Sequence, residues 1–252
     1  MRSSLHSNGQ LGRAGVLRTS GAGRAAAATL AALVLVMAVI AAAVVPTFVD
    51  RAAAADDLTR QVLVGPRNLT CQRVIVLLDQ SGSMAEYAQV RVDAMATLAD
   101  WGPDNLRSDD QLAVVRWADT AVVDTPPTDV GAIGASTFAS DGGGVGDGTE
   151  LLPAVEQVAG MPVGACRTSL VFVSDGEIGR ADQRQLDAAL QGAGVDRVSL
   201  VLPNSASAPE YWMRLFPYSE TFYADPNNAN QTARALGQAI ASATGQQLEV
   251  EG

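Results

Sequence analysis

The 252-residue sequence contains no lysine and only one histidine, His6. Walker-type phosphate loops and Schiff-base chemistry both depend on lysine, so the absence of lysine excludes both. We therefore expect no bound nucleotide. His6 lies in the polar segment that opens the chain. A histidine general base is therefore missing from the globular part, which excludes Ser-His-Asp and Cys-His catalysis there. These absences favour a binding protein over an enzyme.

Positive charge is also scarce, with 17 basic against 27 acidic residues and a net charge of -10. Residues 1–24 contain four arginines and no acid, so residues 25–252 carry a charge of -14. A surface this acidic repels phosphate backbones, which argues against nucleic-acid binding. The use of arginine alone as the long basic residue, with many alanines, indicates a GC-rich bacterial genome.

One long apolar run lies near the N-terminus. Residues 25–49 contain no charged side chain, and a stretch of about 20 such residues spans a bilayer as a helix. Arginines precede it and aspartates follow it, so residues 1–24 are expected to be a cytoplasmic basic leader and the remainder to lie outside the cytoplasm. The alternative is a cleaved signal peptide, with Ala52–Ala55 as the cleavage site and a secreted product. An uncleaved anchor is favoured because the run exceeds the roughly 7–15 apolar residues of a signal peptide.

Beyond an expected linker over residues 50–69, apolar runs of strand length alternate with helical patterns, which is typical of a parallel α/β sheet. The predicted strands are 73–79, 111–118, 121–124, 168–174, 196–202 and 220–224. The predicted helices are 84–101, 150–159, 180–192, 208–215 and 227–243. The polar Asp119-Thr120 turn between the second and third strands predicts one antiparallel hairpin. A single domain over residues 70–245 and a tail over 246–252 are expected.

The first of these strands ends on a group of oxygen-bearing side chains. Val74–Leu78 is an unbroken apolar run, as in a central parallel strand, and Asp79-Gln80-Ser81-Gly82-Ser83 follows it. Carboxylate and hydroxyl oxygens are suitable ligands for hard divalent cations such as Mg²⁺. Serine, glycine and aspartate are also ordinary turn residues, so this segment alone does not define a site.

Two further segments repeat this chemistry. Gly148-Thr149-Glu150 closes a glycine-rich stretch over residues 141–148 and opens a helical pattern, which places the Thr149 hydroxyl on a helix-entry loop. The apolar run that starts at Ser169 ends on Ser174-Asp175-Gly176. The acidic residues Asp141 and Asp147 lie among the glycines, but their spacing is not that of an EF-hand loop.

Together these segments resemble the von Willebrand factor type A domain with its metal-ion-dependent adhesion site. That family carries Asp-x-Ser-x-Ser, then a distant threonine, then a distant Asp-Gly. The matching positions are Asp79, Ser81, Ser83, Thr149 and Asp175. The resemblance covers residues 70–245 and implies a Rossmann-like, mostly parallel sheet with one antiparallel edge strand and helices on both faces.

The resemblance also implies a function. The five oxygens would hold Mg²⁺, with Mn²⁺ or Ca²⁺ as alternatives, and would leave one coordination position free for an Asp or Glu carboxylate of a protein or peptide partner. We therefore expect a membrane-anchored, extracytoplasmic binding module. The alternatives are a metal-dependent hydrolase with a carboxylate base, or a structural subunit of a larger surface assembly.

In type A domains the two strands that end at the aspartates are adjacent and parallel. Cys71 lies eight residues before Asp79, and Cys166 lies nine before Asp175, so both cysteines would lie at the same end of neighbouring strands. Strands are spaced about 4.8 Å apart, which is close to the Cα separation of a disulfide. Export from the cytoplasm favours the Cys71–Cys166 disulfide over two buried free thiols.

A simpler interpretation of the five oxygen-bearing residues remains open at this point. The hydroxyls of Ser81, Ser83 and Thr149 could cap helices, while Asp79 and Asp175 could accept hydrogen bonds from loop amides without any metal.

Four aromatic residues near a predicted short helix are expected to pack in the core, with a partner-contact patch as the alternative. These four residues are Tyr211, Trp212, Phe216 and Tyr218.

Overall fold

The computed structural model describes residues 55–134, 138, 144–203 and 207–251. These residues belong to one compact unit, Arg51–Gly252. The predicted leader, the predicted membrane helix over residues 25–49 and the side chain of Asp141 lie outside the described residues. Within the described part of the chain, no helix is both long and apolar enough to cross a membrane.

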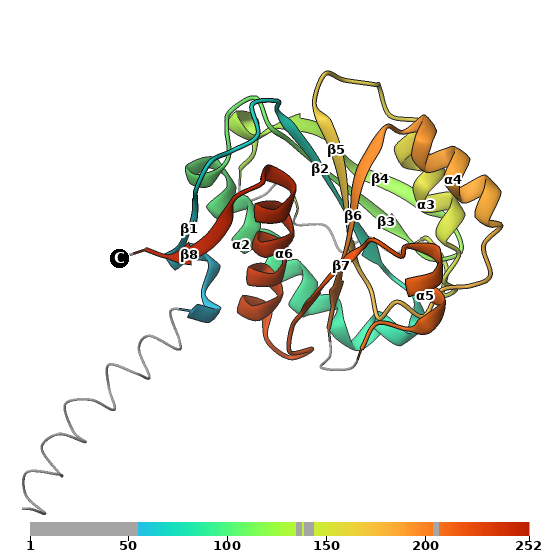
Figure 1. The fold of residues 1–252 in the computed structure, drawn as a ribbon. Helices are drawn as coiled ribbons and strands as arrows, with labels where there is room; N and C mark the ends of the chain where they lie inside the picture. Colours follow the sequence, from blue (N-terminus) through green and yellow to red (C-terminus); the bar gives the residue numbers. More distant parts are fainter. Residues whose placement is uncertain (1–54, 135–137, 139–143, 204–206, 252) are drawn as a thin grey trace, which may run out of the picture. The chain divides into compact units, whose positions relative to one another are not determined.

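A six-stranded sheet forms the centre of this unit, with strand order β4-β3-β2-β5-β6-β7. Its strands are β2 (Gln72–Asp79), β3 (Gln111–Trp117), β4 (Ala121–Asp129), β5 (Arg167–Val173), β6 (Val195–Leu202) and β7 (Glu220–Tyr223). All neighbouring strands are parallel except β3 and β4, which form the antiparallel hairpin at one edge (Figure 1). The predicted mostly parallel, Rossmann-like sheet with one antiparallel edge strand is confirmed.

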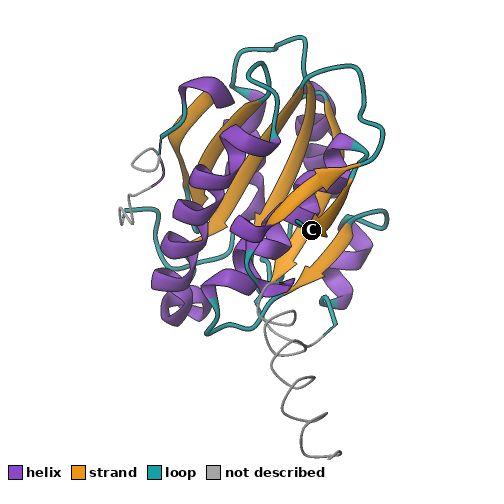
Figure 2. Cartoon of the chain, turned by 90° about the vertical axis from the view of Figure 1, so that its left-hand side faces the viewer, coloured by secondary structure: helices purple, strands orange, loops and turns teal. Residues whose placement is uncertain are grey.

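Helices cover both faces of this sheet (Figure 2). The α-helices are α2 (Ala88–Asn105), α3 (Leu151–Ala159), α4 (Gln183–Gly192), α5 (Glu210–Leu215) and α6 (Ala229–Thr244). Short 3-10 helices are η1 (Leu58–Arg60), η2 (Gly82–Tyr87) and η3 (Val130–Ala132). α2 and α6 pack on one face, and α3, α4 and α5 pack on the other.

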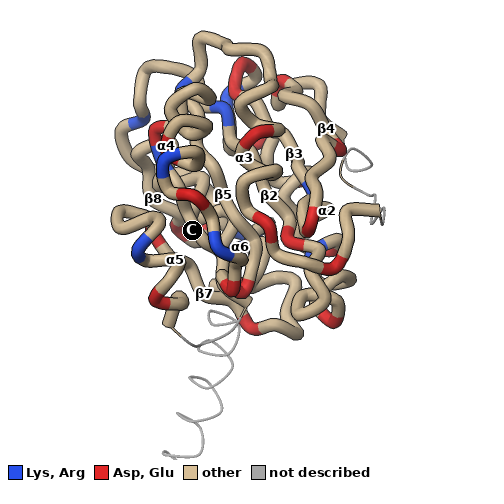
Figure 3. Tube along the Cα trace, turned by 90° about the vertical axis from the view of Figure 1, so that its right-hand side faces the viewer, with Lys and Arg blue, Asp and Glu red and all other residues tan. Residues whose placement is uncertain are grey.

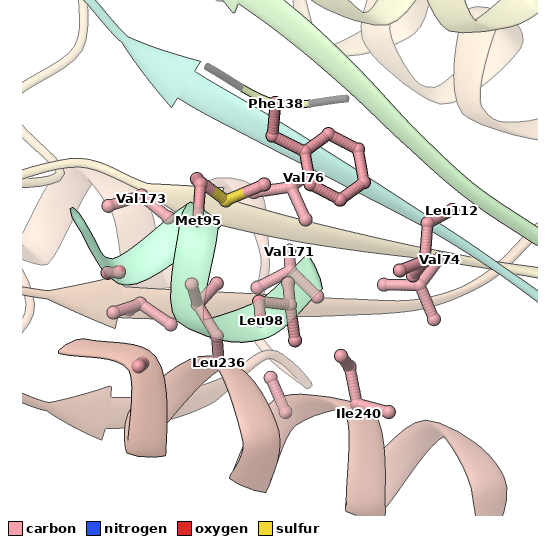
Figure 4. Packing of buried hydrophobic residues seen from close by; sticks show 14 of the residues in the cluster. Val74, Val76, Met95, Leu98, Leu112, Phe138, Val171, Val173, Leu236 and Ile240 are labelled. Carbon is pink, nitrogen blue, oxygen red and sulfur yellow. The ribbon is translucent and has the colours of Figure 1, made fainter. Parts of the chain in front are cut away.

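The central strand β2 is buried along its whole length because successive side chains enter opposite layers. Val74 and Val76 belong to the core formed with α2 and α6, whereas Ile75 and Leu77 belong to the core formed with α3, α4 and α5. Figure 4 shows the first of these cores, where residues of β2 and β5 lie against side chains of α2 and α6. The two cores, one on each face of the sheet, hold the end of β2 and therefore the backbone of Asp79 in one position.

The flanks of the domain differ from the prediction. β1 (Gln61–Val64) pairs antiparallel with β8 (Gln247–Val250) in a separate two-stranded sheet. The segments predicted as a linker (50–69) and a tail (246–252) therefore contain paired strands, and the folded unit extends beyond the predicted limits of 70–245. Each strand has only four residues, too few to show a clear pattern in the sequence.

Two elements near the site also differ from their predicted limits. The helix predicted over 84–101 is split into η2 and α2, and α2 continues to Asn105 with Pro103 inside its last turns. β4 runs to Asp129 rather than to residue 124, through Pro126 and Pro127. An edge strand tolerates proline because one side of its backbone has no neighbouring strand to bond.

The predicted disulfide is present between Cys71 and Cys166, whose Cα atoms are 4.7 Å apart. β2 and β5 are neighbouring parallel strands, and the Arg167 amide donates a hydrogen bond to the Cys71 carbonyl. Both cysteines therefore lie at the end of the sheet opposite Asp79. The alternative of two free thiols is wrong, since the described residues include no free cysteine.

The aromatic group is divided between core and surface. Trp212 and Phe216 are buried and contact each other and Phe172, as predicted for core packing. The Tyr211 hydroxyl accepts a hydrogen bond from the Ala181 amide. Tyr218 is 96% exposed, so core packing does not describe it.

Candidate metal centre

Asp79 is the last residue of β2, and none of its surface is exposed. Its Oδ1 accepts a hydrogen bond of 2.8 Å from the Ser81 amide, and its Oδ2 accepts one of 2.6 Å from the Ser174 hydroxyl. Burial raises the pKa of Asp79, the hydrogen bonds from Ser174 and Ser81 partly offset this, and the nearby charge of Asp175 raises the pKa further. A buried carboxylate of this kind is stabilised in its ionised form by a bound cation.

The two serines after Asp79 lie on the loop that leads into η2. Their hydroxyl oxygens, Ser81 Oγ and Ser83 Oγ, are 3.2 Å apart. Ser81 is buried and Ser83 is exposed, so this pair extends from the interior to the surface. Ser81 occupies the N-cap position of η2, but its side chain makes no capping hydrogen bond. Helix capping therefore does not account for this hydroxyl.

The Thr149 segment lies between the other two segments of the site. The Gly82 amide donates a 3.1 Å hydrogen bond to the Asp147 carbonyl, and the Gly179 amide donates a 2.9 Å hydrogen bond to the Thr149 carbonyl. The N-cap of α3 is Glu150, not Thr149, and no side chain caps this helix. Among the described residues, the Thr149 hydroxyl has no hydrogen-bond partner.

Asp175 follows the end of β5, the strand next to β2. It is partly exposed, and its Oδ1 accepts a 2.9 Å hydrogen bond from the Glu177 amide. The next residue, Gly176, has a φ of +75° and is closely approached by Pro209, so no larger residue fits this turn without strain. The charge of Asp175 contributes to the raised pKa of Asp79, as expected for carboxylates at the ends of the neighbouring strands β2 and β5.

The structure thus brings the segments of all five predicted residues together at the carboxyl ends of β2 and β5. Both aspartates do accept hydrogen bonds from loop amides, as the metal-free interpretation expects, but the hydroxyls of Ser81 and Thr149 do not cap helices. The assignment of the five side chains as metal ligands stays a prediction.

Asp119 supports the Thr149 loop, a role that the sequence analysis missed. Its Oδ2 accepts a 3.2 Å hydrogen bond from the Asp147 amide. Side chains at Gly146 or Gly148 would collide with it, because a Cβ there would lie 2.3 or 1.8 Å from an Asp119 carboxylate oxygen. These glycines therefore allow the loop to lie directly against the β3–β4 turn. The sequence signal is an acidic turn residue together with small residues at alternate positions of a distant loop.

Arg91 of α2 supports the loop that follows Asp79. This arginine of α2 is only 3% exposed, and its Nη1 donates to the carbonyls of Asp79, at 2.6 Å, and Met84, at 3.1 Å. The guanidinium thereby holds the end of β2 and the turn into η2 in one arrangement. A lone arginine on the apolar side of a predicted helix is the sequence signal that was available for this role.

The donor set fits a hard divalent cation. Within the described residues, no three side chains of His, Cys, Asp and Glu form a metal-binding group, so a metal here would need hydroxyl ligands as well as carboxylates. Asp79, Ser81, Ser83, Thr149 and Asp175 supply that mixture of carboxylate and hydroxyl oxygens. Oxygen ligands of this type suit Mg²⁺, Mn²⁺ or Ca²⁺ more than a soft metal.

Comparisons with solved structures identify the fold. The sequence matches no protein-family model, and no curated protein is significantly similar to it. A von Willebrand factor type A structure from Catenulispora acidiphila superposes with a TM-score of 0.53 and 16% identity, covering 72% of this chain and 46% of that one. Proximal thread matrix protein 1 from the mussel byssus, with a zinc-occupied MIDAS motif, gives 0.51 and 15%, covering 70% and 50%.

A third similar structure is the manganese-loaded TRAP protein of Plasmodium vivax, with a TM-score of 0.52 and 12% identity, covering 75% of this chain and 80% of that one. The chain spans about half the length of the first two structures. The chain has the fold of a von Willebrand factor type A domain, as the sequence motifs predict.

Proposed function

We propose that this protein is a non-enzymatic binding module that holds a protein or peptide partner through a divalent cation, Mg²⁺ in the first instance. Asp79, Ser81, Ser83, Thr149 and Asp175 would hold the cation. A carboxylate of the partner would fill the remaining position.

The proposal rests mainly on the hydrogen bonds that the hydroxyl groups of Ser81, Ser83 and Thr149 make and do not make. The Ser81 and Ser83 hydroxyls form a hydrogen bond of 3.2 Å with each other rather than with a helix amide, and the Thr149 hydroxyl has no partner among the described residues. Each of these hydroxyls keeps an oxygen lone pair that a cation could use, and Ser81 lies directly beside the buried Asp79 carboxylate. Two solved structures of the same fold are described as metal-loaded, with zinc and with manganese, which supports a divalent ion.

The charge at the site explains why a partner carboxylate would bind only with the metal. Asp79 and Asp175 already make the site negative, so a further carboxylate is repelled in the absence of a cation. Neutral hydroxyl ligands leave much of the charge of a divalent cation uncancelled. The bound metal therefore supplies the attraction, and this chain supplies the rigid frame of β2 and β5.

We further propose where the protein lies in the cell. Residues 25–49 would anchor the protein as a single-pass membrane helix with the N-terminus in the cytoplasm, and the domain would lie outside the cytoplasm. The charge difference across that segment and the disulfide between Cys71 and Cys166 support this arrangement. Secretion after cleavage near Ala55 is the alternative arrangement.

Cross-linking on intact cells, with and without a chelator, tests this function. A partner recovered with the wild-type protein in Mg²⁺ should be lost with the chelator and lost with Asp79→Ala. Glu156→Ala, which removes an exposed carboxylate of α3, should retain the partner. Unchanged recovery of the partner with the chelator and with Asp79→Ala would contradict the proposal. Metal-dependent conversion of a substrate by the protein would also contradict it, because the protein would then be an enzyme.

A further inference from the structure

The two-stranded sheet formed by β1 and β8 has one edge covered and one edge open. Figure 1 shows this pair beside α2 and α6, apart from the six-stranded sheet. The Glu251 amide donates a 2.8 Å hydrogen bond to the Arg60 carbonyl, which continues the antiparallel register of Gln61 with Val250. Backbone groups alternate in direction along an antiparallel strand. Those of Glu249 and Glu251 therefore face β1, and those of Leu248 and Val250 face away from it.

Side chains of α2 cover the outer edge of β1. The Gln61 carbonyl accepts a 2.7 Å hydrogen bond from Trp101 Nε1, and the Leu63 amide donates a 3.2 Å hydrogen bond to Asn105 Oδ1. These are the two β1 residues whose backbone groups point away from β8, so they confirm the alternation deduced above. The outer side of β1 is thereby closed to a further strand.

The outer edge of β8 has no such cover. On that side, the amides and carbonyls of Leu248 and Val250 have no hydrogen-bond partner among the described residues. An open strand edge of this kind is a template for another strand, and proteins limit such pairing with short edge strands, charged side chains, proline or a bulge. β4, an edge strand of the large sheet, contains Pro126 and Pro127, whereas β8 contains no proline, and its one charged side chain, Glu249, repels acidic strands but not basic ones.

The side chains of β8 indicate which strand would fit. Leu248 packs against Gly237 of α6, and Val250, on the same face, is apolar and 40% exposed. The opposite face carries Glu249 and Glu251, both exposed. A second copy of β8 would bring acidic residues against acidic residues, so self-pairing is disfavoured.

A neighbouring groove has the same sign of charge. Between β1 and α2, a cavity of about 400 Å³ is lined by Asp100, Asp104 and Glu251 and by no arginine. Val62, which pairs with Glu249, also lines it. This groove lies on the β1 side of the small sheet, away from the outer edge of β8, so the charge that a docked strand would meet comes from Glu249 and Glu251 themselves.

We propose that the outer edge of β8 binds an extended segment of a partner protein in which apolar and basic residues alternate. Its backbone would bond to Leu248 and Val250, its apolar side chains would lie beside Val250, and its basic side chains would lie beside Glu249 and Glu251. Strand addition of this type combines backbone hydrogen bonds with alternate side-chain contacts. This surface is separate from the candidate metal centre and does not depend on a metal.

Fluorescence anisotropy with the full-length protein in chelator tests the proposal. The probe is a labelled, amidated octapeptide of alternating valine and arginine, which has no carboxylate for a metal site. We expect it to bind at least tenfold tighter than an octapeptide with the same composition in two blocks. Equal binding of the two peptides would show general charge attraction only and would overturn the proposal.

Two variants and one control locate the binding. Val250→Pro removes an outward amide without removing a β1–β8 hydrogen bond, and Glu249→Arg reverses the charge of an exposed side chain; each should weaken binding at least tenfold. Glu156→Arg makes the same charge change on α3 and should change binding less than twofold. On peptide binding, the amides of Leu248 and Val250 should gain protection from hydrogen exchange. Equal effects of the two arginine variants, or protection elsewhere only, would refute the β8 edge as the site.

Discussion

The Ser174 hydroxyl donates a 2.6 Å hydrogen bond to Oδ2 of Asp79, which joins the carboxyl ends of the neighbouring strands β5 and β2. Both residues are completely buried. The same Ser174 oxygen accepts a 2.9 Å hydrogen bond from the Gly176 amide. One hydroxyl therefore positions the buried carboxylate and also the turn that carries Asp175.

Replacement of this hydroxyl should destabilise the fold. In Ser174→Ala, the Asp79 carboxylate loses one donor and the Gly176 amide loses its acceptor, so we expect a loss of about 1–3 kcal/mol in the free energy of unfolding. Urea unfolding in the presence of a chelator measures it. Ser207→Ala, at an exposed serine, should stay within about 0.5 kcal/mol of wild type. Equal stability of the two variants would show that the Ser174 bond is unimportant.

The pH dependence of stability should reveal the buried Asp79. Burial raises its pKa, with a further contribution from Asp175, so the folded state holds this proton to higher pH than the unfolded chain does. The metal-free protein should therefore lose stability as pH rises from about 3.9, the ordinary carboxyl pKa, through the raised value. The loss should be complete above that raised pKa.

Urea unfolding across this pH range, in chelator, measures the effect. Asp79→Asn should lack this component of the loss, whereas Asp187→Asn, at an exposed residue of α4, should retain it. Mg²⁺ at neutral pH should stabilise the wild type by about 2.7 kcal/mol at 100 times its Kd and leave Asp79→Asn unchanged. Identical pH profiles for wild type and Asp79→Asn would contradict the assignment.

The contact between Asp119 and Gly148 predicts a coupled pair of substitutions. Gly148→Ala places a Cβ 1.8 Å from Asp119 Oδ1, so either the Asp119 side chain gives up its contact with the loop or the loop moves, and in both cases Thr149 loses its support. Calorimetry should show Mg²⁺ affinity falling at least tenfold. Gly192→Ala, where the new Cβ meets no atom within 4 Å outside the local backbone of α4, should keep wild-type affinity.

Asp119→Ala in the same chain as Gly148→Ala removes the collision. The double variant should therefore bind Mg²⁺ more tightly than Gly148→Ala alone, which is a positive coupling between the two sites. Additive effects of the two substitutions would show that Asp119 and Gly148 act independently.

The disulfide should contribute substantially to stability. Cys71 and Cys166 are 95 residues apart in the sequence, and a crosslink that closes so long a loop restricts the unfolded chain. Cys71→Ser with Cys166→Ser should lower the free energy of unfolding by about 2–5 kcal/mol, measured in urea. Mg²⁺ affinity should change little, because the cysteines lie at the opposite end of the sheet. Labelling of two thiols in the native wild-type protein would contradict the disulfide.

The parts of the fold that the sequence predicted are those with a local signal. β2 is recognisable from its unbroken apolar run, and Asp79, Ser81 and Ser83 follow it directly. The edge hairpin of β3 and β4 was visible as two apolar runs around a polar turn. In each case, adjacent residues carry the whole pattern.

The parts that were missed depend on residues far apart in the sequence. β1 and β8 have four residues each and become strands by pairing across more than 180 positions. Asp119 acts on a loop 28 positions away, and Ser174 acts on Asp79 across 95 positions. Ser174 also adjoins the predicted ligand Asp175, and nothing in the sequence distinguishes it from an ordinary last residue of a strand.

Anomalous scattering from Mn²⁺ in crystals of the protein tests the central claim most directly. The account predicts one strong peak bounded by oxygen atoms at the ends of β2 and β5, absent from crystals of Asp79→Ala. The expected ligands, directly or through water, are Asp79, Ser81, Ser83, Thr149 and Asp175. A well-ordered crystal with no peak at that position, or with its peak at other residues, would contradict a metal-dependent binding function.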